Sequence, residues 1–280
     1  MNIANKRAWL VRGVCGLALA WAMGAAASPQ ERQWIGEFTV DGAVTPLTLH
    51  ERAAAKDVKS TVDLPSMGAR EVPLTSFSAN ADHVEFQLDG PPGRFLFAGH
   101  RGKGQLVGEV VHGEEKGSFT LVEVLPPDPA QARAYTGSYE VAPGHVIDIG
   151  PMDEAGGLLV FLDHKTLREG PLYALSATKF ASGPTIAIAY PFVIHVEFLR
   201  SANGVATGLR WQEAGKQVTA RKIAPHRVEE VTVRNGDVVL KGTLMLPDTP
   251  GPHPAIVFAH GSGDATRNVA IWNPYFVRLG

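Results

Sequence analysis

The sequence predicts a mainly β protein, in which two duplicated small antiparallel β modules precede a short segment of a different kind. Three observations support this prediction: short runs alternate apolar and polar residues, turn residues separate these runs, and a set of motifs recurs about 100 residues later. Of the 280 residues, 45% are hydrophobic and 19% are charged, which excludes disorder, collagen and coiled coil. The formal net charge of −2 predicts no nucleic-acid partner.

The first segment, residues 1–27, is expected to be a signal peptide. Lys6, Arg7 and Arg12 precede the uncharged apolar run Gly13–Ala27, which ends in three alanines. A basic start, an apolar middle and small residues before the cleavage point are typical of a secretory signal. An anchoring transmembrane helix is the alternative, but it needs about 20 apolar residues. We therefore expect an exported protein, periplasmic or extracellular, with no stable membrane anchor after cleavage.

Cysteine usage agrees with this expectation. The single cysteine, Cys15, lies within the predicted signal. The mature chain would therefore have no disulfide, no thiol nucleophile and no cysteine-ligated zinc site.

Two β modules are predicted next, at residues 28–129 with a linker and at 130–226. The aromatic-x-Gly-x-aromatic motif of Trp34–Phe38 recurs at Tyr135–Tyr139, and Gly104–Gly108 recurs as Gly204–Gly208. Recurrence at a nearly constant offset indicates duplication. Pro126–Pro129 is the predicted linker.

Alternating runs mark the expected strands of both modules. Turn residues such as Gly90–Gly93, Gly102–Gly104 and Asn203-Gly204 lie between the runs. Short strands at close spacing favour small antiparallel sandwiches or barrels. The predicted strands are Val44–His50, His83–Leu88, Gly117–Val124, Val146–Ile149, Leu158–Leu162 and Ile194–Leu199.

Few side chains in the modules suggest chemistry. His195 and Glu197 lie two residues apart on a predicted strand and therefore share a face. They could form half a metal site, but an exposed polar face is favoured because no third ligand is near in the sequence. Glu114-Glu115 and Asp153-Glu154 are predicted to be solvated loop tips rather than calcium sites. Three aromatic residues are expected in the core rather than on ligand platforms: Trp34, Tyr135 and Trp211.

The last segment, residues 227–280, has the most specific pattern. Glu230–Val233 and Val238–Leu246 are predicted to form a hairpin around Asn235-Gly236. After a turn rich in Pro and Gly, Ala255–Ala259 is apolar without alternation, as expected of a strand buried on both faces. It runs directly into His260, Gly261, Ser262 and Gly263, and a helix reaching Leu279 is predicted after Asp264–Arg267.

Residues 230–280 resemble the opening of an α/β-hydrolase of the exported esterase or prolyl-oligopeptidase-like kind. The resemblance implies that His260–Gly263 form an oxyanion loop. In such a loop a fixed backbone N–H, here of Ser262 or secondly Gly263, stabilises the negative charge of a tetrahedral intermediate. His260 would brace the loop. The duplicated β region also looks like the accessory N-terminal part of such hydrolases.

The family's nucleophile elbow, Gly-x-Ser-x-Gly, does not occur in the chain, because Ser262 is flanked by His260 and Asp264 at the glycine positions. The resemblance therefore implies the front fragment of a serine hydrolase, truncated before the elbow and inactive alone. In the full-length protein it would cleave a small-molecule ester or a peptide by acyl transfer, with no metal or cofactor. The alternative is a non-enzymatic, periplasmic, lipocalin-like binding protein, since small β-barrels can enclose a ligand.

Overall fold

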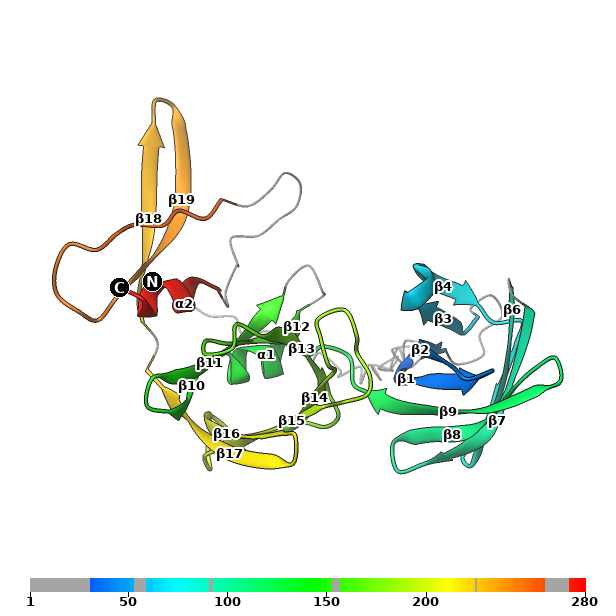
Figure 1. Ribbon diagram of the computed structural model, residues 1–280. Helices are drawn as coiled ribbons and strands as arrows, with labels where there is room; N and C mark the ends of the chain where they lie inside the picture. Colours follow the sequence, from blue (N-terminus) through cyan, green and yellow to red (C-terminus); the bar gives the residue numbers. More distant parts are fainter. Residues whose placement is uncertain (1–30, 53–58, 91–92, 153–156, 225, 260–271) are drawn as a thin grey trace, which may run out of the picture.

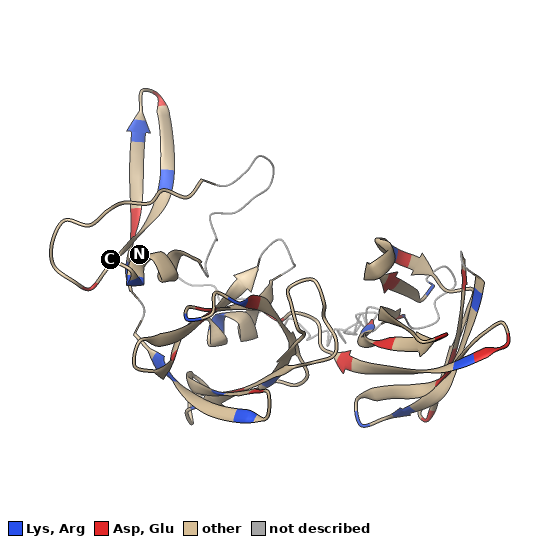
Figure 2. Cartoon of the chain, in the orientation of Figure 1, with Lys and Arg blue, Asp and Glu red and all other residues tan. Residues whose placement is uncertain are grey.

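The computed structural model describes residues 31–52, 59–90, 93–152, 157–224, 226–259 and 272–280. The described residues are mainly β, with a curled nine-stranded sheet, a closed eight-stranded barrel, a two-stranded hairpin and two short α-helices (Figure 1). Charged side chains of both signs are spread over the two larger units (Figure 2). Neither described helix has the length and apolar character that a membrane crossing requires.

The first module is the nine-stranded antiparallel sheet, in the order β4-β3-β2-β1-β9-β8-β7-β6-β5. Apart from β4 and β5, strands that are neighbours in sequence pair with each other, and β1 also pairs with β9, so the sheet curls round. Its open edges, β4 and β5, are separated in sequence by Leu74 and Thr75. A 3₁₀ turn, Pro65–Met67, separates β3 from β4. The strands are β1 Arg32–Val40, β2 Ala43–Glu51, β3 Thr61–Leu64, β4 Ala69–Pro73, β5 Ser76–Ala79, β6 His83–Gly90, β7 Gly93–Gly102, β8 Gln105–His112 and β9 Glu115–Val124.

Alternation along these strands sends one set of side chains into a shared apolar core. Phe86 and Phe97 stack with ring centroids 4.3 Å apart, and Phe38 meets Phe97 edge to face at 5.3 Å. Such aromatic pairs contribute about 0.5–1.5 kcal/mol each beyond the area that they bury. Trp34 is completely buried among them, as the sequence predicted.

The second module is a closed barrel of eight antiparallel strands, drawn from green to yellow in Figure 1. Again neighbours in sequence pair, and β10 closes the barrel against β17. Helix α1, Pro129–Tyr135, precedes the barrel; Asp128 caps it by accepting from the Ala130 N–H at 2.8 Å, and Pro129 suits its first turn. The strands are β10 Gly137–Ala142, β11 His145–Met152, β12 Leu158–Asp163, β13 Glu169–Ala174, β14 Lys179–Ser182, β15 Ile194–Arg200, β16 Ala206–Glu213 and β17 Lys216–Ile223.

Apart from the fourth and fifth strands, the two modules share one connectivity, in which each strand pairs with the next and the first strand pairs with the last. In the first module β4 and β5 do not pair, whereas in the barrel β13 and β14 are joined by the pairs Tyr173↔Ala181 and Ala174↔Phe180. The pairing of β13 with β14 closes the barrel, and the lack of pairing between β4 and β5 leaves the first sheet open. That the modules arose by duplication stays a prediction.

Glycines of the recurring motifs lie where strands approach closely. An ideal Cβ at Gly36 on β1 would lie 1.9 Å from the Thr120 carbonyl oxygen. At Gly108 and Gly208, on the next-to-last strand of each module, it would lie 2.2 and 2.4 Å from a carbonyl oxygen of the neighbouring strand. Glycine at these positions therefore permits backbone contacts that any side chain would block.

The last described segment is a hairpin of β18, Arg227–Asn235, and β19, Val238–Leu246, followed by an irregular stretch and helix α2, Trp272–Arg278. The hairpin projects from the barrel (Figure 1), and several of its apolar side chains are exposed, among them Val233, Val238 and Leu240. Helix α2 packs through Trp272 and Tyr275 against Val160 and Leu162 on the outer wall of the barrel.

The prediction that residues 227–280 begin an α/β-hydrolase domain is wrong. The described residues are antiparallel β and show no alternation of helices with parallel strands. Ala255–Ala259 is irregular rather than a strand, and Val257 is 90% exposed. An apolar run becomes a buried strand only when flanking strands and helices cover it, and the described residues supply no such cover. The fold-class prediction is thus corrected to a barrel, a curled sheet and a hairpin.

Candidate functional site

The residues predicted from the hydrolase resemblance, His260, Gly261, Ser262 and Gly263, lie outside the described residues. The fold around them is nevertheless not that of the family. The prediction of a serine hydrolase, esterase or peptidase is therefore wrong, since it rested on an α/β domain that the described, β-rich residues do not form. Among the described residues, the polar clusters and the hollows lie on the barrel and on the curled sheet.

The interior of the barrel is packed with side chains. Tyr135 and Phe198 stack with centroids 4.0 Å apart, and Phe161 meets Trp211 edge to face at 5.0 Å. Both Tyr135 and Trp211 are core residues, as the sequence predicted. The crevice between the barrel and the linker before α1 holds only about 10 Å³. The barrel interior is therefore a core rather than a ligand chamber, as in other filled eight-stranded barrels.

Both ends of the barrel are closed by specific contacts. Helix α1 covers one end, where the Tyr135 hydroxyl donates to the Ala177 carbonyl at 2.7 Å. At the other end Arg168 pairs with Glu213 and donates to the carbonyls of Gly183 and Pro184 at 3.3 and 3.2 Å. These contacts give hydrogen-bond partners to polar groups at both ends of the barrel.

A hollow of about 240 Å³ lies on the outer wall of the barrel, over β14–β17. We call it the outer groove. Two cross-strand rows of outward-facing residues form its floor. Its polar lining residues are Lys179, Glu197 and Arg210 in one row and His195, Gln212 and Gln217 in the next.

The charges of the outer groove do not balance. Glu197 accepts from Arg210 at 2.8 Å and is the register partner of both Arg210 and Lys179. One carboxylate thus lies between two cations, which leaves an excess of positive charge. Gln212 and Gln217 add amide donors and acceptors beside it. The groove can therefore offer charge-assisted hydrogen bonds to an anionic group and neutral ones to hydroxyls.

Sequence reasoning found part of this groove. His195 and Glu197 do share a face, and that face is the outer one. It missed Lys179, Arg210 and the two glutamines, because they come from other strands. Alternation on those strands marks them as outward-facing, but only the register brings them beside His195.

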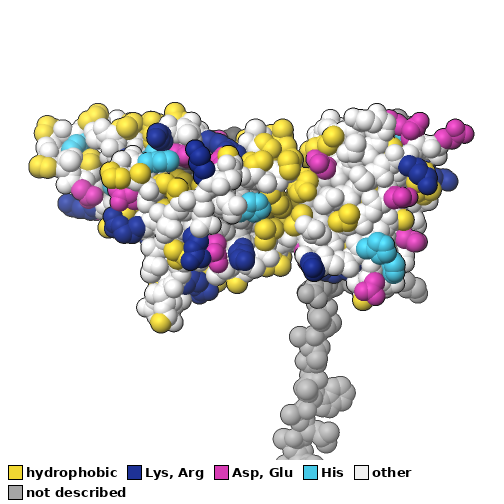
Figure 3. All heavy atoms as spheres, turned by 60° about the horizontal axis from the view of Figure 1, so that its bottom comes forward, with side chains coloured by type: hydrophobic (Ala, Val, Ile, Leu, Met, Phe, Trp, Pro, Cys, Tyr) yellow, Lys and Arg dark blue, Asp and Glu magenta, His cyan; other side chains and the backbone are white. Residues whose placement is uncertain are grey.

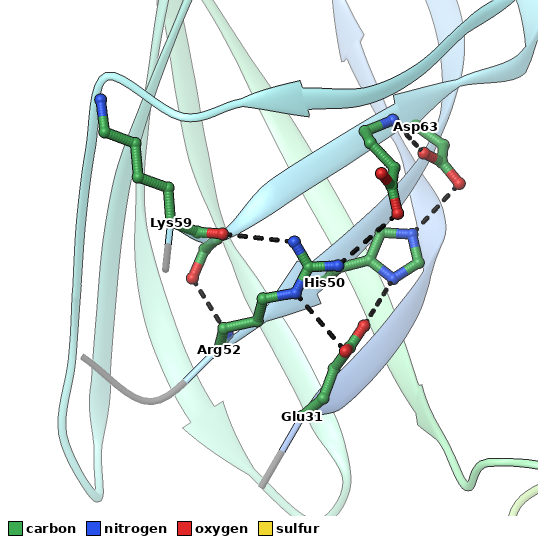
Figure 4. Close-up of polar contacts among 7 residues, drawn as sticks. Glu31, His50, Arg52, Lys59 and Asp63 are labelled. Atoms are coloured by element: carbon green, nitrogen blue, oxygen red, sulfur yellow. Dashed lines mark hydrogen bonds and ion pairs between the residues drawn. The ribbon is translucent and has the colours of Figure 1, made fainter. Parts of the chain in front are cut away.

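A second polar cluster lies at one end of β2 and β3 in the first module (Figure 4). The His50 ring lies between Glu31 and Asp63, at 3.2 and 3.1 Å, and Arg52 reaches Glu31 and the Lys59 carbonyl. The polar groups drawn satisfy one another. We therefore assign this cluster to holding strand ends together rather than to ligand binding.

A third cluster is buried where α2 meets the barrel. Asp148 is 3% exposed and receives a hydrogen bond from the His164 ring at 2.5 Å, and Arg278 of α2 lies 3.8 Å from its other oxygen. Burial, and then the nearby Arg278 charge, lower the pKa of His226 beside them. Buried charges need partners, so Asp148 anchors α2 to the wall.

In the part of the chain that the structure describes, no three or more His, Cys, Asp or Glu side chains gather as a metal centre. Glu114 and Glu115 are exposed at a turn, as predicted, whereas Asp153-Glu154 lie outside the described residues.

No protein-family model matches this chain, and no curated protein matches it.

Proposed function

We propose that this protein is a non-enzymatic binding protein, built on a lipocalin-like closed antiparallel barrel, which holds a small polar anion in the outer groove. The observation that carries the proposal is the hollow of about 240 Å³ over β14–β17, beside an interior that is packed. A ligand would thus bind on the wall of the barrel and not inside it.

The lining of the groove defines the ligand class. Arg210 and Lys179 would hold a carboxylate, because a guanidinium offers paired N–H donors and an ammonium a point charge. Gln212, Gln217 and His195 would hydrogen-bond to hydroxyl groups. Pockets for drug-sized ligands have about 300–1,000 Å³. The smaller outer groove suits a compact ligand, such as a sugar acid.

The site of action forms part of the same proposal. Residues 1–27 have the pattern of a secretory signal, and we propose that the mature protein works in the periplasm or outside the cell. The formal charge of −2 and the mixed surface charges give no support to nucleic-acid binding.

Titration of the full chain with D-glucuronate, followed by ¹H–¹⁵N NMR, tests this proposal. We expect saturable shifts confined to residues of β14–β17, and none with D-glucose, which lacks the carboxylate. Arg210→Gln should weaken glucuronate binding by about tenfold or more, since a charge-assisted hydrogen bond is worth about 1.5–3 kcal/mol.

Arg221→Gln is the matched control, because Arg221 also pairs with a glutamate at 2.8 Å but lies outside the groove. Glucuronate shifts that spread over both modules, or that persist unchanged in Arg210→Gln, would contradict the proposal.

A further inference from the structure

Two histidines of the first module face each other across neighbouring strands. His83 on β6 and His100 on β7 are direct register partners, and both are exposed. Their ring centroids lie 4.9 Å apart, with the ring planes inclined by 52°. The two imidazoles therefore lie side by side on the outer face of the sheet.

This pair differs from most of the other described histidines, which are held by oxygen atoms. His145 and His164 each bond to an aspartate, and His112 pairs with Asp41. Within the described residues, the side chains of His83 and His100 make only the ring contact with each other, while the His83 backbone N–H donates to Asn80. Their ring nitrogens are thus not committed to a protein partner.

The surroundings of the pair favour a cation. Glu85 lies two residues from His83 on the same face, and its register partner is the small Ala98. Glu85 is thereby the diagonal neighbour of His100, and such neighbours on a sheet lie about 7–8 Å apart, within reach of a long side chain. Figure 3 shows histidine side chains beside acidic ones on the first module.

We propose that His83 and His100 together bind one divalent transition-metal ion, such as Zn²⁺ or Cu²⁺. Neutral imidazole is a preferred ligand of both ions, with metal–nitrogen distances of about 2.0–2.1 Å for zinc. Two rings that already face each other need only side-chain rotation to direct one nitrogen each at a shared ion. Water completes the coordination, and the Glu85 carboxylate adds favourable charge.

Calorimetric titration of the untagged full chain with ZnCl₂ at pH 7.5 tests this proposal. We expect one ion per chain. His83→Gln and His100→Gln should each lower the affinity by about tenfold or more. Binding should also weaken at pH 5.5, because protons compete for the imidazole nitrogens.

His253→Gln is the control, since His253 lies outside both the histidine pair and the outer groove and its ring bonds to the Thr249 carbonyl at 2.9 Å. It should bind Zn²⁺ as the unaltered chain does. With Cu²⁺, electron paramagnetic resonance should show nitrogen ligands that disappear in the His83→Gln/His100→Gln double variant. Absence of saturable Zn²⁺ binding, or full binding by the double variant, would overturn the proposal.

Discussion

Replacing His164 by alanine should destabilise the barrel far more than replacing His145. The two histidines form reciprocal pairs between β11 and the end of β12: His164, directly after β12, bonds to Asp148 at 2.5 Å, and His145 bonds to Asp163 at 2.9 Å. The carboxylates that they leave behind differ. Asp148 is 3% exposed, whereas Asp163 is 15% exposed and still accepts from the Lys165 N–H at 2.8 Å.

The magnitudes follow from this difference. Removing the partner of a buried carboxylate leaves that group uncompensated, which costs about 3–5 kcal/mol. Arg278, 3.8 Å from Asp148, offsets part of that cost, so we expect about 3 kcal/mol for His164→Ala. For His145→Ala we expect about 1 kcal/mol, the worth of one ordinary hydrogen bond.

Urea denaturation followed by ¹H–¹⁵N NMR measures these costs, because barrel amides can be followed separately from those of the first module. A difference of about 2 kcal/mol corresponds to a midpoint shift of about 1 M for a typical urea dependence. The double variant Asp148→Asn/His164→Ala should be more stable than His164→Ala alone, since it removes the unpaired charge. Equal losses for the two single variants, or a double variant less stable than His164→Ala, would refute the reasoning.

Three further predictions concern packing and pH. Gly36→Ala should lower the melting temperature steeply, because its Cβ would lie 1.9 Å from a backbone oxygen, while Gly102→Ala, with open space around it, should change it little; calorimetry compares them. Tyr139→Phe should cost about 1 kcal/mol, because its buried hydroxyl donates to the Tyr135 carbonyl at 2.6 Å; a denaturant midpoint that matches the unaltered chain would argue against this. The lowered pKa of His226 means that the unfolded chain binds a proton more readily, so this contribution to stability is present above about pH 6.5 and is lost as the pH falls. Between pH 8 and pH 5 the melting temperature should therefore depend less on pH in His226→Gln than in the unaltered chain.

The sequence predicted the strands better than their assembly. The six alternating runs all fall within strands, because alternation reports directly which side chains face a core. Closure of the barrel depends on pairs such as Ser138↔Ile223, between residues that no local pattern connects. The outer groove and the His83–His100 pair likewise need the register of neighbouring strands, which periodicity alone does not determine.

The hydrolase interpretation failed for a related reason. Ala255–Ala259 has the composition of a doubly covered strand, but composition does not supply the elements that cover it. The hairpin prediction was local, since an Asn-Gly turn joins strands that are adjacent in sequence, and it was confirmed. Local signals thus predicted local structure, whereas the family and the activity inferred from them did not follow.

The pairing of first strand with last has a consequence for the order in which the chain folds. β1 cannot obtain its second neighbour until β9 has been synthesised, and β10 waits in the same way for β17. During synthesis each module therefore carries an unpaired N-terminal edge until its final strand emerges, and such edges invite association with other chains. The barrel loses its last unpaired edge when β17 pairs with β10, whereas the first module keeps β4 and β5 as open edges after β9 has paired with β1, so only the second module becomes free of edges on completion.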